Sequence, residues 1–271
     1  GLYSMETGIL LRMNHATKPE KLVAASSFAN WVTTKNLSIP LASKFVSRLR
    51  THVERDKLVV VEQIGNERIA RYKFEGRKGE KKVLYAEFFS GGNLILVDEK
   101  GIIIDVETSH TFRHRSLVPG VEYILPPSRG APLQDLNLEI LFSMQREEAK
   151  KGETLSAVKW FGRSVGTSRK FVEEIFERSG IDTNKPAMSL SEDDLEKLAF
   201  ASESLRADLQ NAHSGYILIP AEESDVEIDV CGIVPRAWSR AVEKGLTTIQ
   251  DFPSLSDALD EVQIQSLVLE K

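Results

Sequence analysis

An acid and a base stand side by side in a short polar turn of this sequence. Glu67 and Arg68 follow Gly65 and Asn66, between two segments rich in β-branched residues, VVVEQI and RIARYKF. A guanidinium at a hairpin tip can bind a phosphate or a base edge, and a neighbouring carboxylate can orient it or accept from an exocyclic amine. The plain alternative is a solvated surface pair that contributes little. This turn is the first candidate for a binding site.

Further positive charges surround this turn in the sequence. Pro40 and Ser43 predict a helix start, and Lys44, Arg48 and Arg55 fall on one stripe of the expected helix. Such a ridge suits phosphate contact, with a solvated face as the alternative. The full set of candidates for contact with a polyanion is Lys44, Arg48, Arg50, Arg55, Asn66, Glu67, Arg68, Arg71, Asn93, Arg113 and Arg115.

Two other groups of residues match the pattern of a catalytic or metal site. Residues 162–166 match the G-x-S-x-G pattern of a hydrolase nucleophile, and Asp182 and His213 follow in the required order. The pattern needs a central parallel strand before the serine, which this sequence does not predict, so we expect no hydrolase. His110 and His114 are four residues apart, but no cysteine or other histidine is near them, so we expect no metal and no cofactor.

The candidate turn belongs to a series of short strands. Segments rich in β-branched and aromatic residues alternate with glycine-bearing turns, which predicts an antiparallel meander. Those segments are LVVVEQI, RIARYKF, KVLYAEFF, NLILVD and IIIDVE. Two earlier segments, ILLRM and KLVAASSFANWVTT, are expected to add strands. The helix expected before the meander has Phe45, Val46, Leu49 and Val53 on one face.

A stretch rich in proline and glycine, PGVEYILPPSRGAP, separates these strands from a mainly helical region. It predicts a boundary near Pro127, with a β-rich domain over residues 1–127 and a helical domain over residues 128–271. Helical patterns occupy LEILFSMQREEAKKGETLSAVKWFGRSVG, SRKFVEEIFERSG and SEDDLEKLAFASESLRADLQ, and stop at Gly152, Gly166 and Gly180. A small hairpin, GYILIP with VEIDV, and a last helix, SLSDALDEVQIQSLVLEK, complete an α+β fold.

Composition limits the class of protein. With 271 residues, 41% hydrophobic and 28% charged, the chain can bury a core. It has no apolar run long enough to cross a bilayer and no secretory leader, and its single cysteine, Cys231, cannot form an internal disulfide. We therefore expect a cytoplasmic protein with no membrane partner.

The net charge of −5 is unevenly distributed. Residues 1–130 contain 20 Lys and Arg against 14 Asp and Glu, whereas residues 131–271 contain 15 against 26. The first part therefore suits a polyanionic partner and the second does not, the alternative being two solvated surfaces of different composition.

Several spaced motifs resemble, in family order, the N-terminal region of the NFACT family of NEMF- and RqcH-like proteins. They are FVSRLRTHV, EQIGNERI, GGNLILVD, PGVEYILPP, KFVEEIFERSGIDTNKP and FPSLSDALDEV. The resemblance is to the archaeal type and covers nearly all of the chain. It implies a β-sandwich domain like the N-terminal domain of formamidopyrimidine-DNA glycosylases. A domain of the helix-hairpin-helix type would follow and run into a truncated coiled-coil helix.

The resemblance also implies a function in ribosome-associated quality control. NFACT proteins bind large ribosomal subunits that carry stalled peptidyl-tRNA, and recruit tRNA for template-free C-terminal tailing of the nascent chain. The ribosome supplies the peptidyl-transfer chemistry, so no enzyme activity is expected. The implied partners are tRNA and the rRNA of the large subunit, and the candidate residues become RNA-binding residues.

At the turn after Gly65 the family carries an Asp-Arg pair required for tailing and tRNA engagement. Here the pair is Glu67-Arg68, so the arginine is kept and the acid is longer by one methylene. We expect a two-domain fragment, because the family's first helix, coiled coil and downstream RNA-binding domain are not in the sequence. The alternatives are an adhesin-like module that binds fibronectin or fibrinogen, and a DNA-glycosylase-like enzyme, for which the chain lacks a Pro-Glu start.

Overall fold

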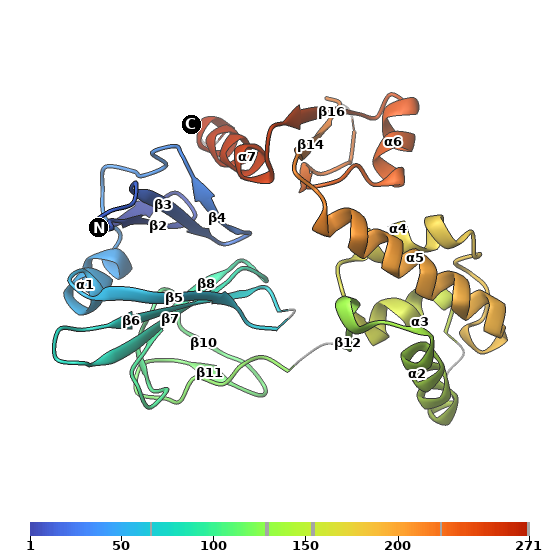
Figure 1. Cartoon of the computed structure of the whole chain (residues 1–271), viewed down its shortest axis with the longest axis horizontal. Coiled ribbons are helices and arrows are strands. Elements are labelled where there is room, and N and C mark those ends of the chain that lie inside the picture. The colour runs from blue at the N-terminus through green and yellow to red at the C-terminus, as the bar shows by residue number, and fades with distance from the viewer. Residues whose placement is uncertain (66, 128–129, 153–154, 223, 270–271) are drawn as a thin grey trace. The chain divides into compact units, whose positions relative to one another are not determined.

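The protein was analysed as a computed structural model that describes residues 1–65, 67–127, 130–152, 155–222 and 224–269, with side chains as far as residue 265 (Figure 1). The chain divides into two compact units. The first comprises residues 1–127 and 259–271, and the second residues 128–258. The expected helical domain, 128–271, is therefore corrected at its end. The physical reason is that Asp260 accepts a hydrogen bond from Trp31 Nε1 at 2.7 Å inside the first unit.

The first unit begins with an antiparallel sheet of four strands, ordered β1-β2-β3-β4. Its strands are β1 (Leu2–Met5), β2 (Gly8–Met13), β3 (Lys21–Ser26) and β4 (Asn30–Thr33). The last two confirm that the alanine- and serine-rich segment forms strands. Gly8, at a φ of 130°, lets the backbone approach β3, because a Cβ there would lie 2.1 Å from the Ala25 carbonyl oxygen.

A second antiparallel sheet of the first unit confirms the predicted meander, with five strands in the order β5-β6-β7-β8-β9. They are β5 (Lys57–Gln63), β6 (Ile69–Glu75), β7 (Lys81–Glu87), β8 (Asn93–Val97) and β9 (Ile103–Val106). Helix α1 (Lys44–Val53) begins at the N-cap Ser43, whose side chain accepts from the Val46 N–H at 3.1 Å. As expected, α1 buries Phe45, Val46, Leu49 and Val53. Arg55 lies beyond its end, so the basic ridge predicted on the helix loses that residue.

The core of the first unit joins both sheets and α1. Ile9 and Leu11 from the first sheet pack in one cluster with Tyr72 and Leu84 from the second. A smaller cluster, around Ile95, contains residues of β8 and β9 together with Leu117. The segment around residue 110 forms two short paired strands, β10 (His110–Thr111) and β11 (Ser116–Leu117).

The second unit is mainly helical. Its elements are β12 (Ala131–Pro132), η1 (Leu133–Asp135), α2 (Leu138–Lys151), α3 (Ala157–Ser164), β13 (Val165–Gly166), α4 (Arg169–Ser179), η2 (Ala187–Ser189), α5 (Glu192–Gln210), β14 (Gly215–Pro220), β15 (Asp229–Cys231), α6 (Arg236–Glu243) and β16 (Thr247–Phe252). Helix α7 (Leu255–Leu269) follows. Gly152 and Gly180 end α2 and α4 in the left-handed conformation, as expected. Gly166 does not end α3, which stops earlier and is followed by β13.

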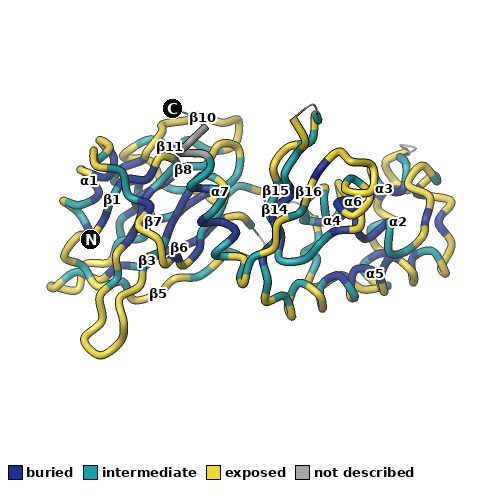
Figure 2. Tube along the Cα trace, turned by 90° about the horizontal axis from the view of Figure 1, so that it is seen from above, coloured by how far each residue is buried: buried dark blue, intermediate teal, exposed yellow. Residues whose placement is uncertain are grey.

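The sequence did not predict strand β16 or helix α6 of the second unit. Strand β16 joins β14 and β15 in a sheet of three strands, and α6 precedes it. Along α5, buried and exposed residues alternate at helical spacing, as Figure 2 shows. The α+β fold class is thus confirmed. Within the described residues, no helix has the length and apolar character to span a membrane.

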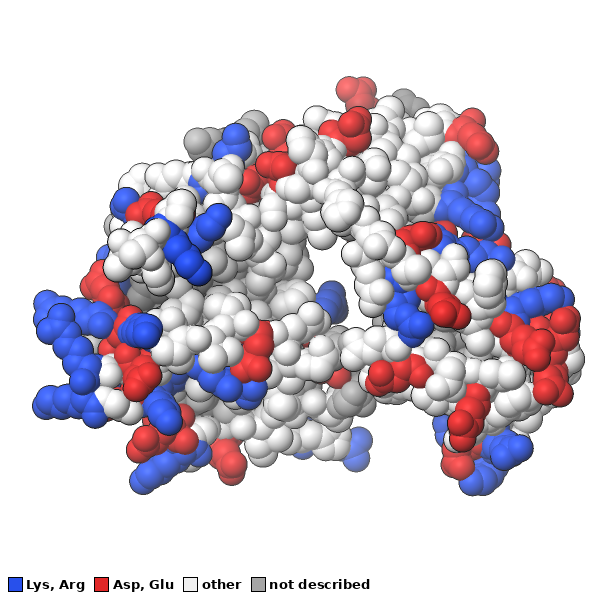
Figure 3. All heavy atoms as spheres, in the orientation of Figure 1, with Lys and Arg blue, Asp and Glu red and all other residues white. Residues whose placement is uncertain are grey.

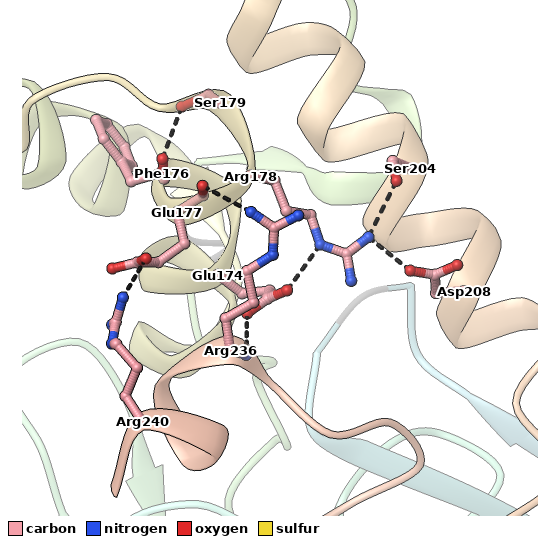
Figure 4. A network of polar contacts seen from close by, with 9 residues as sticks. All are labelled: Glu174, Phe176, Glu177, Arg178, Ser179, Ser204, Asp208, Arg236 and Arg240. Atoms are coloured by element: carbon pink, nitrogen blue, oxygen red, sulfur yellow. Dashed lines mark hydrogen bonds and ion pairs between the residues drawn. The ribbon is translucent and has the colours of Figure 1, made fainter. Parts of the chain in front are cut away.

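Several charged residues of the helical unit pair with one another. Glu174, which is 2% exposed, accepts from Arg178 Nε at 2.7 Å and from the Arg236 backbone N–H at 2.7 Å (Figure 4). Arg178 also binds Asp208 at 2.6 Å, and an ion pair joins Arg240 to Glu177. These contacts tie α4 to α5 and α6, so the cations among them are used by the fold.

Candidate nucleic-acid interface

The Glu67-Arg68 turn closes the β5–β6 hairpin. The Glu67 N–H donates to the Ile64 carbonyl at 2.9 Å, and Gln63 Nε2 donates to the Glu67 carbonyl at 3.0 Å. Gly65 has a φ of 51°, in the left-handed region that glycine tolerates. Asn66 lies outside the described residues.

The charged groups of this turn show no polar contact with the part of the chain that the structure describes. Arg68 is exposed and Glu67 is half-buried. Among the residues with described side chains, neither has a hydrogen-bond or ion-pair partner, and they do not pair with each other. The two side chains therefore do not pair with each other, and the plain alternative that remains is that water solvates both charges.

A cleft lies at the same end of the five-stranded sheet. The Phe88 N–H donates to the Arg68 carbonyl at 2.9 Å, which attaches the loop between β7 and β8 to the turn. This loop continues through Gly91 and Gly92, which line a cleft of about 180 Å³. Its other lining residues are Glu6, Thr7, Gly8, Ala25, Ser26, Ser27, Asn93, Leu94 and Glu107. Hydroxyl, backbone and carboxylate groups thus lie on the loops next to the turn, a feature that the sequence did not reveal.

Two arginines predicted on or near the helical ridge have partners within the fold. Arg48 makes a bidentate contact with Asp105, with Nε to Oδ2 at 2.6 Å and Nη2 to Oδ1 at 3.0 Å. Arg50 Nε donates to the Leu2 carbonyl at 2.8 Å, and its guanidinium lies 5.8 Å from the centre of the Tyr3 ring. Both side chains thus have polar contacts within the fold, but half of the Arg48 side chain stays exposed, and the partner of Arg50 is an uncharged carbonyl. Their contact with phosphate stays a prediction.

Arg71 also has an ion-pair partner within its sheet. Its Nη2 lies 2.8 Å from Glu62 Oε1, and Lys73 Nζ lies 3.0 Å from the same oxygen. Hydrogen bonds, first from Lys73 and then from Arg71, lower the pKa of the Glu62 carboxyl. Arg71 is thus part of an ion cluster on β5 and β6 rather than a free cation.

Asn93 and Arg115 are structural as well. Asn93 is buried, donates to the Thr108 carbonyl at 2.8 Å and accepts from the Thr108 N–H at 3.1 Å. Arg115 Nη2 donates to Glu87 Oε2 at 2.7 Å, and their side chains are only 6% and 4% exposed. Tyr123 donates to the same carboxylate at 2.8 Å, and burial raises the pKa of its hydroxyl. These polar groups are satisfied internally, which disfavours the predicted RNA contact of both residues.

The remaining predicted cations, Lys44, Arg55 and Arg113, are exposed at separate places in the first unit. Five further cations lie near Arg55, on the β6–β7 turn and on the adjoining strands. None of them was among the candidates predicted from the sequence. They are Lys57, Arg77, Lys78, Lys81 and Lys82. In the described part of the chain, no three His, Cys, Asp or Glu residues are grouped so as to hold a metal ion.

The fold and the turn define a two-unit α+β protein whose exposed charged tip is suited to a polyanion. Residues 4–265 match the family model described as NFACT N-terminal and middle domains. The chain is 31% identical over 185 residues to the archaeal Rqc2 homolog aRqcH of Methanocaldococcus jannaschii, covering 68% of this chain. The chain belongs to the NFACT family. It spans about a quarter of that relative, 27% of its length.

Solved structures share this fold. The fibrinogen-binding protein from Staphylococcus aureus superposes with a TM-score of 0.70 and 20% identity, covering 96% of this chain and 89% of the other. The N-terminal part of the fibronectin/fibrinogen-binding protein from Streptococcus suis gives 0.65 and 18% identity, covering 98% and 91%. At such identities the likeness shows the fold alone.

Proposed function

We propose that this chain is the RNA-binding part of a cytoplasmic ribosome-associated quality control factor, which engages tRNA on stalled large ribosomal subunits. Membership of the NFACT family and the similarity to an archaeal Rqc2 homolog support the proposal. The observation that carries it is the Glu67-Arg68 turn. Its two charged groups have no partner among the described residues, whereas the fold binds Arg48, Arg71 and Arg115.

Within this proposal Arg68 makes the principal contact. Its planar guanidinium can donate two parallel hydrogen bonds to a phosphate or to a guanine edge. The half-buried Glu67 orients that guanidinium or accepts from an exocyclic amine. The protein itself performs no bond chemistry, and recruits tRNA for the tailing of the stalled chain.

The test compares tRNA binding by the unmodified chain with that of the variants Arg68→Ala and Arg68→Lys. Arg146→Ala, which removes one exposed arginine from the second unit, is the matched control. We expect Arg68→Ala to weaken binding by about tenfold or more, corresponding to the loss of a charge-assisted contact of about 1.5–3 kcal/mol. We expect Arg68→Lys to restore only part of it, because lysine cannot form the bidentate contact.

Fluorescence anisotropy with labelled tRNA measures the dissociation constants, and circular dichroism verifies that the variants are folded. Equal affinities for Arg68→Ala and Arg146→Ala would reject Arg68 as the principal contact.

A further inference from the structure

A second group of exposed cations lies at the other end of the five-stranded sheet. It occupies the β6–β7 turn and the segment that joins α1 to β5, and its members are Arg55, Lys57, Arg77, Lys78 and Lys81. The strand register brings its parts together, because Glu75 is opposite both Lys57 on β5 and Lys81 on β7. In Figure 3 Lys and Arg atoms gather at this end of the first unit, at the left edge of the view. We call this group the basic end.

The nearby acids offset the positive charge of the basic end only in part. Asp56 pairs with Lys82 at 2.9 Å, and neither side chain is more than 20% exposed. Glu80 Oε2 accepts from the Lys78 backbone N–H at 3.1 Å, so that carboxylate is used to hold the turn. Glu54 and Glu75 are exposed, but no ion pair joins them to the five cations among the described residues.

The turn holds its cations in a defined position. The Gly76 N–H donates to the Glu80 carbonyl at 2.8 Å, and the Gly79 N–H donates to the Gly76 carbonyl at 3.0 Å. Gly79 has a φ of 86° and thus the backbone freedom that this turn needs. A hydrogen-bonded hairpin presents Arg77 and Lys78 with less loss of conformational entropy on binding than a flexible tail would.

We propose that the basic end binds the phosphate backbone of RNA, as a contact separate from the Arg68 turn. Strand β6 connects the two sites, and six steps of about 3.3 Å place them about 20 Å apart at opposite ends of the strand. The basic end offers cations without an exposed aromatic ring among its members, so it would position RNA rather than read its sequence. This inference rests on the proposed RNA-binding function and adds a second surface to it.

The test uses the triple variant Arg77→Gln, Lys78→Gln, Lys81→Gln in the 271-residue chain. The matched control is Arg146→Gln, Lys159→Gln, Lys244→Gln, which removes the same charge from exposed positions of the acidic second unit. The probes are total deacylated tRNA and a fully paired RNA duplex of arbitrary sequence. For both, we expect the slope of log affinity against log salt to become shallower by about 2–3, because three phosphate contacts are lost. The control should keep the original slope.

Each outcome decides between the two sites when Arg68→Ala is measured in parallel. Equal salt slopes for the triple variant and its control would overturn the proposal that the basic end binds RNA, even if Arg68→Ala weakens tRNA binding. A shallower slope in the triple variant with normal binding by Arg68→Ala would support the basic end and reject the Arg68 assignment. Thermal unfolding followed by circular dichroism verifies that each variant is folded.

Discussion

The buried contact between Arg115 and Glu87 allows a direct test of whether Arg115 has a structural role. We expect Glu87→Ala to lower the free energy of unfolding by about 3–5 kcal/mol, because it leaves a buried guanidinium without its counter-charge. Two hydrogen bonds from Arg115 and one from Tyr123 end on this carboxylate, at 2.5, 2.7 and 2.8 Å. The Glu87 side chain is 4% exposed and the Arg115 side chain 6%, so water does not replace the lost carboxylate as a partner of Arg115.

Replacing both charged partners gives the sharper comparison. In the double variant Glu87→Leu, Arg115→Met no buried charge is left, and we expect most of the lost stability to return. Urea denaturation followed by circular dichroism measures both variants. The double variant should also bind tRNA as the unmodified chain does, since Arg115 is enclosed by the fold. A loss below about 1 kcal/mol in Glu87→Ala, or weaker tRNA binding by a stable double variant, would refute this assignment.

Two further predictions concern stability. Trp31→Phe should lower the free energy of unfolding, measured in urea, by about 1–3 kcal/mol, because Asp260, which is 2% exposed, loses its 2.7 Å hydrogen bond. An unchanged unfolding midpoint would contradict the placement of residues 259–271 in the first unit. The hydrogen bond from Lys185 is the main cause that lowers the pKa of Asp194 to about 2, so this carboxylate stabilises the fold above about pH 4 and loses that effect as the pH falls towards 2. Asp194→Asn should therefore destabilise the protein at pH 7 and have little effect near pH 2, and a cost that does not change with pH would be inconsistent with it.

Local patterns were sufficient to predict most of the fold. The alternation of β-branched residues with glycine turns predicted the meander, and Ser43 predicted the start of α1, because both signals depend on neighbours in the sequence. Strand β16 was missed because its sequence, TTIQDF, is short and polar and becomes a strand by pairing with β14. The end of the helical domain was missed because the contact of Asp260 with Trp31 spans most of the chain.

The candidate site was predicted less completely, for a physical reason. A sequence shows that a cation is present but not whether an acid neutralises it. Arg48 and Asp105 are far apart in sequence and form a bidentate pair in the fold. Arg115 and Glu87 are also far apart in sequence and form such a pair. The sequence could indicate that Arg68 is exposed, because a hairpin tip is a local feature and exposes its side chains.

A photo-crosslink from the turn tests the central claim most directly. A benzoylphenylalanine is placed at Glu67 of the chain, next to Arg68, and the same group at Arg146 of the second unit serves as the control. After irradiation with ribosomal large subunits and tRNA, we expect the probe at Glu67 to crosslink to tRNA and the control not to. If the probe at Glu67 forms no crosslink to tRNA, or if both positions crosslink equally, the assignment of this turn as the tRNA contact is contradicted.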